Sequence, residues 1–391
     1  MIHCIKIVAV YLARYVLRVL WVFPVKRNRV LFVAFEGRVY GCNPKYIFEC
    51  LQDHLGDTCE YVWCLNAEVE IPEVFHAGCV KYLSPRYLFY LFTSSVVITN
   101  LLIEPFFTKR RRQLVITTWH GGGAYKVGDN KSPVVTRQRG RYMRVLRTLR
   151  TGQTDYALSS CQAFTDTHYA SFGIEPKHFL PTGTPRNDLF FRPGCDAFRK
   201  KILRRLDIDT DKTIILYAPT YRGLWHGARL PATLLDVTEV SNAVRERFGR
   251  ETVFLLRLHP NLKGVGGELM AGAVDVSRYA DMQELLLAAD VFITDYSSAL
   301  WDYSFTGRPG FLFVPDLEEY ERTTRLYTPI DLWPYPYAKD TGQLRSLIRN
   351  YDEEAALKRI RAHHELLGSY ENGTATESVC KIIEGHIMTD C

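Results

Sequence analysis

The chain has 391 residues, of which 47% are hydrophobic and 24% are charged, and its formal net charge is +6. This composition excludes a disordered chain and gives room for about two globular domains, each with its own core. The ten cysteines are scattered singly, with no CxxC pair and no Cys/His spacing typical of a zinc site. We therefore expect a reduced, cytoplasmic protein and assign the cysteines neither a metal nor a redox role.

The N-terminal segment, residues 5–23, is apolar but carries Lys6, Arg14 and Arg18. At about 100° per residue these cations fall on one side of a helix, opposite an apolar arc. A charge at the centre of a bilayer costs ~3 kcal/mol, which a helix lying in the membrane interface avoids. We therefore expect residues 1–24 to form an amphipathic helix on an anionic membrane surface; a spanning helix and a core or dimer helix are the alternatives.

After this segment, short apolar runs alternate with helical patterns, which predicts a parallel sheet covered on both faces. The strands predicted in the first half are residues 29–35, 60–65, 80–83, 95–100, 113–118 and 155–160. Basic residues gather again in residues 129–150, where apolar positions share one helical face. That segment fits lipid headgroups or a lipid-linked pyrophosphate, or it is an ordinary solvated helix face.

The strand over residues 113–118 runs into Trp119, His120 and three glycines, and Lys126 follows. Glycines after a strand let a backbone approach a ligand closely. A histidine at such a strand end is a candidate general base because imidazole titrates near neutral pH. The alternative is a histidine that only caps the loop. The segment matches neither a Walker A loop nor GxGxxG.

The second half repeats the alternation after a linker predicted at residues 192–196. Its predicted strands are residues 213–218, 254–258, 291–294 and 309–314. Its predicted helices are residues 234–248, 281–288 and a group within 341–383. Residues 316–337 are predicted to be a loop covering a cleft. The strand over residues 291–294 ends in Asp295, Ser297 and Ser298 before a helical pattern. Such a strand end suits a phosphate or diphosphate, and an ordinary helix cap is the alternative.

Five short blocks, in this order, resemble the CDP-glycerol glycerophosphotransferase family of teichoic acid synthesis. They are Trp119-His120-Gly121 with Lys126, Gly183-x-Pro185-Arg186-Asn187-Asp188, Ala218-Pro219-Thr220-Tyr221-Arg222, His259-Pro260, and Thr294-Asp295-Tyr296-Ser297-Ser298 with Asp302-Tyr303. The resemblance implies a GT-B fold, in which two Rossmann-like doubly wound domains face a cleft. It also implies that the second domain binds the donor nucleotide and that neither a metal nor a cofactor is required.

By the same resemblance, His120 would take the proton from the acceptor hydroxyl, and His259 would be a second catalytic residue at the donor diphosphate. The residues assigned to substrate binding are Lys126, Arg186, Asp188, Thr220, Arg222, Pro260, Thr294, Asp295, Ser297, Ser298 and Asp302. Arg186 and Arg222 would supply charge-assisted bonds, and Asp302 would brace its loop. Attack on the phosphorus next to glycerol expels CMP and builds negative charge that fixed cations and N–H groups must stabilise.

Two blocks depart from the family pattern. The family often has Gly-Lys-Ala-Ser-Glu-Arg near its end, where residues 373–378 read Gly-Thr-Ala-Thr-Glu-Ser and lack the lysine and the arginine. The glycines after His120 also replace a more usual Gly-Thr-Pro-like run. The first departure removes one expected donor-binding arginine, and the second changes the expected acceptor pocket.

The expected reaction moves glycerol phosphate from CDP-glycerol to a hydroxyl of an undecaprenyl-diphosphate-linked saccharide or of a growing teichoic-acid or capsule-like polymer, at the cytoplasmic face of a bacterial membrane. CDP-ribitol as donor, a GT-B glycosyltransferase using a nucleotide sugar, and an envelope binding protein with a decayed site are the alternatives. Nucleic acid is not expected as a partner, and a homo-oligomer is allowed. The expected domains are residues 1–24 (membrane helix), 25–192 (acceptor domain), 193–365 (CDP-glycerol-binding domain) and 366–391 (closing helix).

Overall fold

The computed structural model describes residues 2–66, 69, 71–126, 133–223, 229–259, 262 and 270–388. It divides into two compact units. Unit 1 holds Met1–Gly121, Val127–Leu189 and Ser369–Cys391, and unit 2 holds Gly122–Lys126 and Phe190–Gly368. The chain therefore leaves unit 1 after Leu189, near the predicted boundary at residue 192, and returns to it for the C-terminal helix. The short segment 122–126 also belongs to unit 2.

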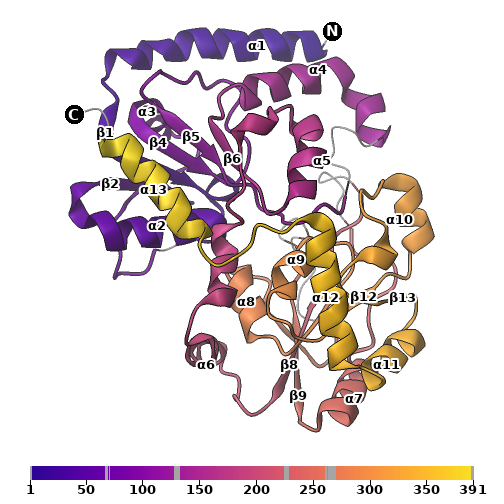
Figure 1. Cartoon of the computed structure of the whole chain (residues 1–391). Coiled ribbons are helices and arrows are strands. Elements are labelled where there is room, and N and C mark those ends of the chain that lie inside the picture. Colours follow the sequence, from indigo (N-terminus) through magenta and orange to yellow (C-terminus); the bar gives the residue numbers. More distant parts are fainter. Residues whose placement is uncertain are drawn as a thin grey trace. The chain divides into compact units, whose positions relative to one another are not determined.

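Unit 1 is built on a seven-stranded sheet with the order β3-β2-β1-β4-β5-β6-β7 (Figure 1). Its strands are β1 (Lys26–Val33), β2 (Glu60–Cys64), β3 (Gly78–Val80), β4 (Ser94–Thr99), β5 (Leu114–Thr117), β6 (Tyr156–Leu158) and β7 (Phe179–Leu180). All the pairings between these strands are parallel. The strand order reverses between β1 and β4, which is the doubly wound arrangement, and ligands of such sheets bind beyond the carboxyl ends of the strands at this point.

Helices cover both faces of this sheet because its strands are apolar at consecutive positions. They are α1 (Ile2–Val16), η1 (Leu17–Val22), η2 (Phe35–Gly37), α2 (Cys42–Leu55), η3 (Gly56–Thr58), α3 (Pro85–Thr93), α4 (Pro133–Thr151), α5 (Gln162–Phe172), η4 (Pro176–His178) and α13 (Ala375–Met388). Val30 and Phe32 of β1 pack in one core cluster with α2 and α13, and Leu31 and Val33 pack in another with α3. Figure 1 shows α13 running beside α2.

Unit 2 begins within η5 (Pro185–Phe191) and contains a six-stranded parallel sheet with the order β10-β9-β8-β11-β12-β13. Its strands are β8 (Thr213–Ala218), β9 (Thr252–Leu256), β10 (Ala273–Asp275), β11 (Val291–Thr294), β12 (Gly310–Phe313) and β13 (Tyr337–Ala338). Its helices are α6 (Cys195–Arg205), α7 (Val237–Phe248), α8 (Met282–Ala288), α9 (Ala299–Ser304), α10 (Leu317–Thr323), η6 (Ile330–Leu332), α11 (Thr341–Arg349) and α12 (Glu353–Leu367). This strand order again reverses at its first strand, between β8 and β11.

Two predicted features need correction. The loop expected over residues 316–337 contains α10, a helix that starts at Leu317 with Glu318 and Glu319 in its first turn, where acidic side chains favour the positive end of the helix dipole. The strand expected over residues 80–83 is shifted to Gly78–Val80. The strands β7, β10 and β13 were not predicted because two or three residues are too few to show an alternating pattern.

The N-terminal helix forms as α1 and continues into the 3₁₀ helix η1. The basic segment predicted over residues 129–150 forms α4 from Pro133, with a kink at Gly140, and residues 129–132 lie outside the described part of the chain. Among the helices that the structure describes, none combines the length and the apolar character needed to cross a bilayer.

Candidate active-site residues

His120 lies three residues after Thr117, the last residue of β5, beside the carboxyl ends of β1 and β4 in unit 1. Its Nδ1 is 3.0 Å from the backbone oxygen of Asn100, which directly follows β4. Its ring contacts Phe35, which follows β1, in an edge-on arrangement with ring centroids 5.3 Å apart. Asn100 joins these segments, because its side-chain oxygen accepts a hydrogen bond of 2.8 Å from the backbone N–H of Phe35. His120 is therefore placed at the topological switch point of the sheet.

The hydrogen bond to Asn100 determines which ring nitrogen of His120 can act as a base. A backbone carbonyl only accepts hydrogen bonds, so Nδ1 must carry the hydrogen at this contact. In the neutral imidazole, Nε2 is then the nitrogen with the lone pair. This is the arrangement that a general base needs, with one nitrogen oriented by the protein and the other able to accept a proton.

The backbone around His120 is strained. Trp119, Phe35 and Cys42 have φ values of 55°, 47° and 58°, in the left-handed region that side chains other than glycine rarely adopt. Such residues cost of order 1–3 kcal/mol each and gather at functional sites. Their position next to the ends of β1 and β5 supports a functional role for this edge of unit 1.

A second polar residue, Asn43 in the first turn of α2, holds the strand end before His120. Its side-chain nitrogen donates to the backbone oxygens of Thr118 and Trp119 at 3.2 and 3.0 Å, and its oxygen accepts from the backbone N–H of Arg186 at 3.1 Å. The Arg186 side chain is buried and reaches the sulfur of Cys42 at 3.6 Å. Sequence analysis gave Asn43 no role in the site, because its partners are distant in the chain.

Asp188 serves as the N-terminal cap of α13. Its two carboxylate oxygens accept hydrogen bonds from the backbone N–H groups of Ala375 and Thr376, at 3.2 and 2.7 Å. The block that departs from the family pattern, residues 373–378, is thus the start of α13 and is fixed to unit 1 through this aspartate. The buried position of Asp188 agrees with a structural contact of this kind.

The glycine run after His120 leads into unit 2. A Cβ atom on Gly122 would lie 2.1 Å from Cδ1 of the buried Trp301, so only glycine fits there. Three residues later, the Tyr125 hydroxyl is 2.8 Å from Nε2 of His363, while Nδ1 of His363 lies 2.6 Å from the backbone oxygen of Leu332. Burial lowers the pKa of His363 to about 4, so the ring is neutral and its Nε2 accepts from Tyr125. Sequence reasoning missed Tyr125 and His363.

Lys126 ends this segment with its backbone in an antiparallel bridge to Leu326, and Thr328 donates through its hydroxyl to the backbone oxygen of Ala124 at 2.5 Å. The segment 122–126 is therefore fixed within unit 2 by backbone and side-chain contacts. Five residues after the candidate base, the chain is anchored in the other unit.

In unit 2, Arg222 forms a cluster with two carboxylates that follow β11 and β12. Its Nε and Nη2 bind the two oxygens of Asp316 at 2.6 and 3.1 Å, and its Nη1 binds Asp295 at 2.9 Å and Thr220 at 2.9 and 3.0 Å. Asp295 also accepts from the backbone N–H groups of Thr220 and Tyr296. The guanidinium lies over the ring of Tyr296, which stacks on Tyr320 of α10.

This cluster braces the loops that follow β8, β11 and β12. Burial lowers the pKa of Arg222, but its hydrogen bonds to Asp316 and the charge of Asp295 outweigh burial and raise the pKa above its ordinary value. Burial likewise raises the pKa of Asp316, and the bonds from Arg222 outweigh it and hold that pKa below its usual range. Arg222 and Asp316 are thus charged, and Arg222 also binds Asp295, so the three residues fix the loop geometry around Thr220.

The polar residues at the end of β11 have distinct partners. The buried Thr294 hydroxyl donates to the backbone oxygen of Ala218 in β8 at 2.7 Å, and Asp302 accepts from the Gln283 side chain at 2.9 Å. These two contacts join neighbouring elements of unit 2. Ser297 and Ser298 are partly exposed at the start of α9, where the Ser297 oxygen accepts from the N–H of Ala299 at 3.2 Å.

His259 is exposed after β9, and its ring contacts that of Tyr221 with centroids 4.7 Å apart. Tyr221 follows β8, the neighbouring strand, so His259 and the Arg222 cluster lie at the same edge of the unit 2 sheet. Pro260, the other predicted residue of this block, lies outside the described residues.

Comparisons with known proteins identify relatives that match nearly the whole chain. A profile of the CDP-Glycerol:Poly(glycerophosphate) glycerophosphotransferase family matches residues 15–385. The teichoic acid poly(glycerol phosphate) polymerase of Bacillus spizizenii is 27% identical over 95% of this chain and 95% of its own length, and that organism's teichoic acid ribitol-phosphate primase is 30% identical over 94% and 93%. The poly(glycerol phosphate) polymerase of Staphylococcus epidermidis is 29% identical over 93% of this chain, which spans 51% of that polymerase.

Solved structures give the same relationship. The wall teichoic acid polymerase TagF superposes with a TM-score of 0.81 at 27% identity, covering 94% of this chain and 91% of that one. A histidine variant of TagF soaked with CDPG superposes with a TM-score of 0.80 at 27% identity, covering 94% and 90%. The expected GT-B class with two Rossmann-like halves is confirmed by this likeness and by the two sheet orders. The chain therefore belongs to the CDP-glycerol:poly(glycerophosphate) glycerophosphotransferase family.

Proposed function

We propose that this protein transfers glycerol phosphate from CDP-glycerol to a hydroxyl of a lipid-linked saccharide or of a growing glycerol-phosphate polymer in teichoic acid synthesis, with release of CMP. The observation that carries this proposal is the family match over residues 15–385, which takes in both Rossmann-like units and every predicted site residue. The similarity to a TagF structure soaked with CDPG supports the choice of donor.

In the proposed reaction, His120 is the general base. The acceptor hydroxyl gives its proton to Nε2 while Nδ1–H stays bonded to the backbone oxygen of Asn100, which orients the ring and stabilises the imidazolium that forms. The hydroxyl oxygen then attacks the phosphorus next to glycerol, a phosphorus–oxygen bond to CMP breaks, and CMP leaves. A base of this kind contributes about 10²–10⁴-fold to the rate.

The donor binds, in this proposal, at the edge of unit 2 where His259 follows β9 and where Ser297 and Ser298 follow β11, with β8 between these two strands. Hydroxyl and imidazole groups there bind the diphosphate and stabilise the charge that builds on the leaving phosphate. The nearby carboxylates Asp295 and Asp316 are both bound by Arg222. Because they are satisfied in this way, they are poorly suited to hold a divalent cation, and we propose a reaction that needs none.

We further propose that the protein works on a membrane surface, which it contacts through its N-terminal helix. The apolar residues Ile5, Val8, Leu12, Tyr15, Val19 and Val22 are each at least 60% exposed and recur every three or four positions. Arg14, in contrast, turns inward and donates to the backbone oxygen of Pro105 at 2.8 Å. This exposed stripe is a large apolar surface that a bilayer interface would cover.

Basic residues lie where this stripe ends. Arg110 donates to the backbone oxygen of Phe23 at 2.5 Å and lies near the Trp21 ring. With Arg111 and Arg112 it lines a hollow beside Pro24. Each basic residue near an anionic surface adds about 1 kcal/mol of attraction, so this hollow suits lipid headgroups at the edge of the inserted helix.

The function is tested by incubating the purified protein with labelled CDP-glycerol and a lipid-linked disaccharide. We expect one CMP released for each glycerol phosphate that appears on the lipid. Parallel reactions with CDP-ribitol and with UDP-sugars identify the donor. Transfer from CDP-ribitol alone, or from a UDP-sugar alone, would contradict the proposal.

A further inference from the structure

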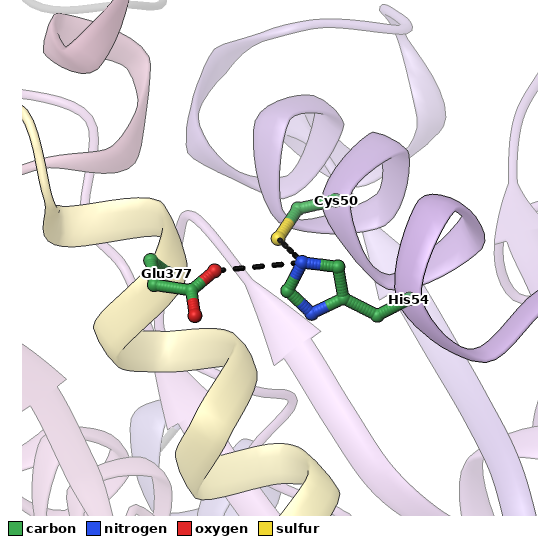
Figure 2. A group of neighbouring side chains, drawn as sticks. All are labelled: Cys50, His54 and Glu377. Atoms are coloured by element: carbon green, nitrogen blue, oxygen red, sulfur yellow. Dashed lines mark hydrogen bonds and ion pairs between the residues drawn. The ribbon is translucent and has the colours of Figure 1, made fainter.

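Three potential metal ligands meet on the surface of unit 1, outside the residues assigned to the reaction (Figure 2). Cys50 and His54 are one helical turn apart on α2, and Glu377 comes from α13. Nε2 of His54 is 3.8 Å from the Cys50 sulfur and 3.4 Å from a Glu377 carboxylate oxygen. All three ligand atoms lie within 4.8 Å of one another.

These separations are close to those around a tetrahedral zinc ion. Bond lengths of about 2.3 Å to sulfur and about 2.0–2.1 Å to nitrogen and oxygen place tetrahedral ligand atoms roughly 3.3–3.6 Å apart. The observed nitrogen–oxygen distance falls in this range, and the nitrogen–sulfur distance exceeds it slightly. The third pair, the Cys50 sulfur and a Glu377 carboxylate oxygen, lies within 4.8 Å.

A fourth residue prepares the histidine for coordination. Nδ1 of His54 is 2.7 Å from a carboxylate oxygen of Glu384, one of the two acidic residues of α13 that face this histidine. Because the carboxylate accepts, Nδ1 carries the hydrogen, and in the neutral ring Nε2 holds the lone pair that points toward Cys50 and Glu377. A carboxylate bonded to the outer nitrogen of a ligating histidine is the common supporting contact in protein zinc sites.

We propose that Cys50, His54 and Glu377 bind one Zn²⁺ ion, with Glu384 orienting His54 and water in the fourth position. A thiolate with an imidazole selects a borderline-soft ion over Mg²⁺ or Ca²⁺, which prefer oxygen ligands. The oxygen of Glu377 that faces His54 is the ligand, and its other oxygen pairs with Lys381 at 3.1 Å. Both contacts fit one carboxylate.

The role of this ion is structural. Cys42, which contacts Arg186, is the first residue of α2, whereas His54 lies near its end, twelve residues on (54 − 42). At about 1.5 Å per residue this places the cluster roughly 18 Å along the helix from the His120 side of unit 1. The ion joins α2 to α13, the helix with which the chain returns to unit 1 after unit 2. It therefore fixes the C-terminal helix and takes no part in the transfer reaction.

The test is a titration of the reduced, metal-stripped full-length protein with Zn²⁺ against a chromogenic chelator, repeated with Co²⁺ as a spectroscopic probe. We expect one tight site per chain and a thiolate-to-Co²⁺ charge-transfer band. Cys50→Ser and His54→Asn should each abolish tight binding and the band. Glu384→Gln should weaken binding by about 10–100-fold, because it removes only the supporting contact.

Matched controls are Cys79→Ser and His76→Asn, which replace exposed residues of the same types in unit 1. These variants should bind zinc like the unaltered protein, and zinc should raise the melting temperature of the unaltered protein but not that of His54→Asn. Absence of a tight site, or equal zinc affinity in Cys50→Ser, His54→Asn and the controls, would overturn the proposal. Because zinc binding is measured without CDP-glycerol, the result tests the zinc site independently of the proposed reaction.

Discussion

At the scale of single residues, the proposal depends most on the imidazole of His120. Replacing it with alanine should lower turnover by about 10²–10⁴-fold, because the acceptor hydroxyl loses its base, while CDP-glycerol binding measured by calorimetry is retained. The matched control is His178→Ala. His178 makes the same kind of bond from Nδ1 to a backbone oxygen, that of Asp155, before β6. Turnover that is unchanged in His120→Ala, or equally low in His178→Ala, would refute the assignment.

The Arg222 cluster gives a second prediction at this scale. Its arginine and Asp295 are almost fully buried, so Arg222→Met leaves uncompensated carboxylates and should lower the free energy of unfolding by about 3–5 kcal/mol. The comparison is Arg349→Met, which breaks an exposed pair with Glu246 and should lower the free energy of unfolding far less, because water screens this pair. Urea titrations measure both values. Equal costs would show that burial of the Arg222 cluster is not what stabilises these loops.

At the scale of elements, α1 should determine membrane binding. Val8→Asp combined with Leu12→Asp places two charges on the exposed stripe and should strongly reduce sedimentation with anionic liposomes. Val74→Asp is the control, because Val74 is equally exposed but lies outside the helix. Unreduced binding of the double variant would show that α1 is not the contact. Reduced binding of Val74→Asp to the same degree would show that negative charge alone explains the effect.

The sequence predicted most long elements because their patterns are local. Residues 213–218 and 291–294 were expected as strands and form β8 and β11 with those bounds, since a buried parallel strand is apolar at every position. The site was predicted less completely. Blocks around His120 and Arg222 were found by their order along the chain, but the partners that orient them, such as Asn100 and Asp316, come from other strand ends.

Contacts across large sequence separations could not be read from the sequence. Tyr125 and His363 meet only after α12 packs in unit 2, and no periodicity reports such a pair. The Cys50, His54 and Glu377 cluster is a further case. The cysteines and histidines show no zinc-site spacing along the chain, and the third ligand, Glu377, comes from α13, with which the chain returns to unit 1. Such constellations depend on the topology of the whole chain.

At the scale of the whole molecule, buried histidines should make the protein sensitive to acid. Burial lowers the pKa of His168 in unit 1, and of His363 and His364 in unit 2, from 6.5 to about 4. Below pH 6.5 the unfolded chain then binds more protons than the folded one. The stability that these histidines contribute is therefore fully present above that pH and is lost as the pH falls toward 4.

The share of this acid sensitivity that comes from His168 can be measured separately. His168→Leu keeps an apolar contact with Phe164 but cannot bind a proton. When the pH is lowered from about 7 to about 5, the free energy of unfolding should therefore fall by roughly 1–2 kcal/mol less in this variant than in the unaltered protein. The control is a substitution at the exposed His76, which should leave the acid loss unchanged. Urea titrations at the two pH values provide the measurement, and an identical loss in His168→Leu would contradict the argument.

In the proposed transferase, protein groups alone activate the acceptor and stabilise the departing CMP. The most direct test is the rate of CMP release from CDP-glycerol, with a lipid-linked acceptor present, before and after a strong chelator is added. We expect the rate to be retained in chelator and not to increase when magnesium is added. Loss of activity in chelator that magnesium restores would contradict this expectation.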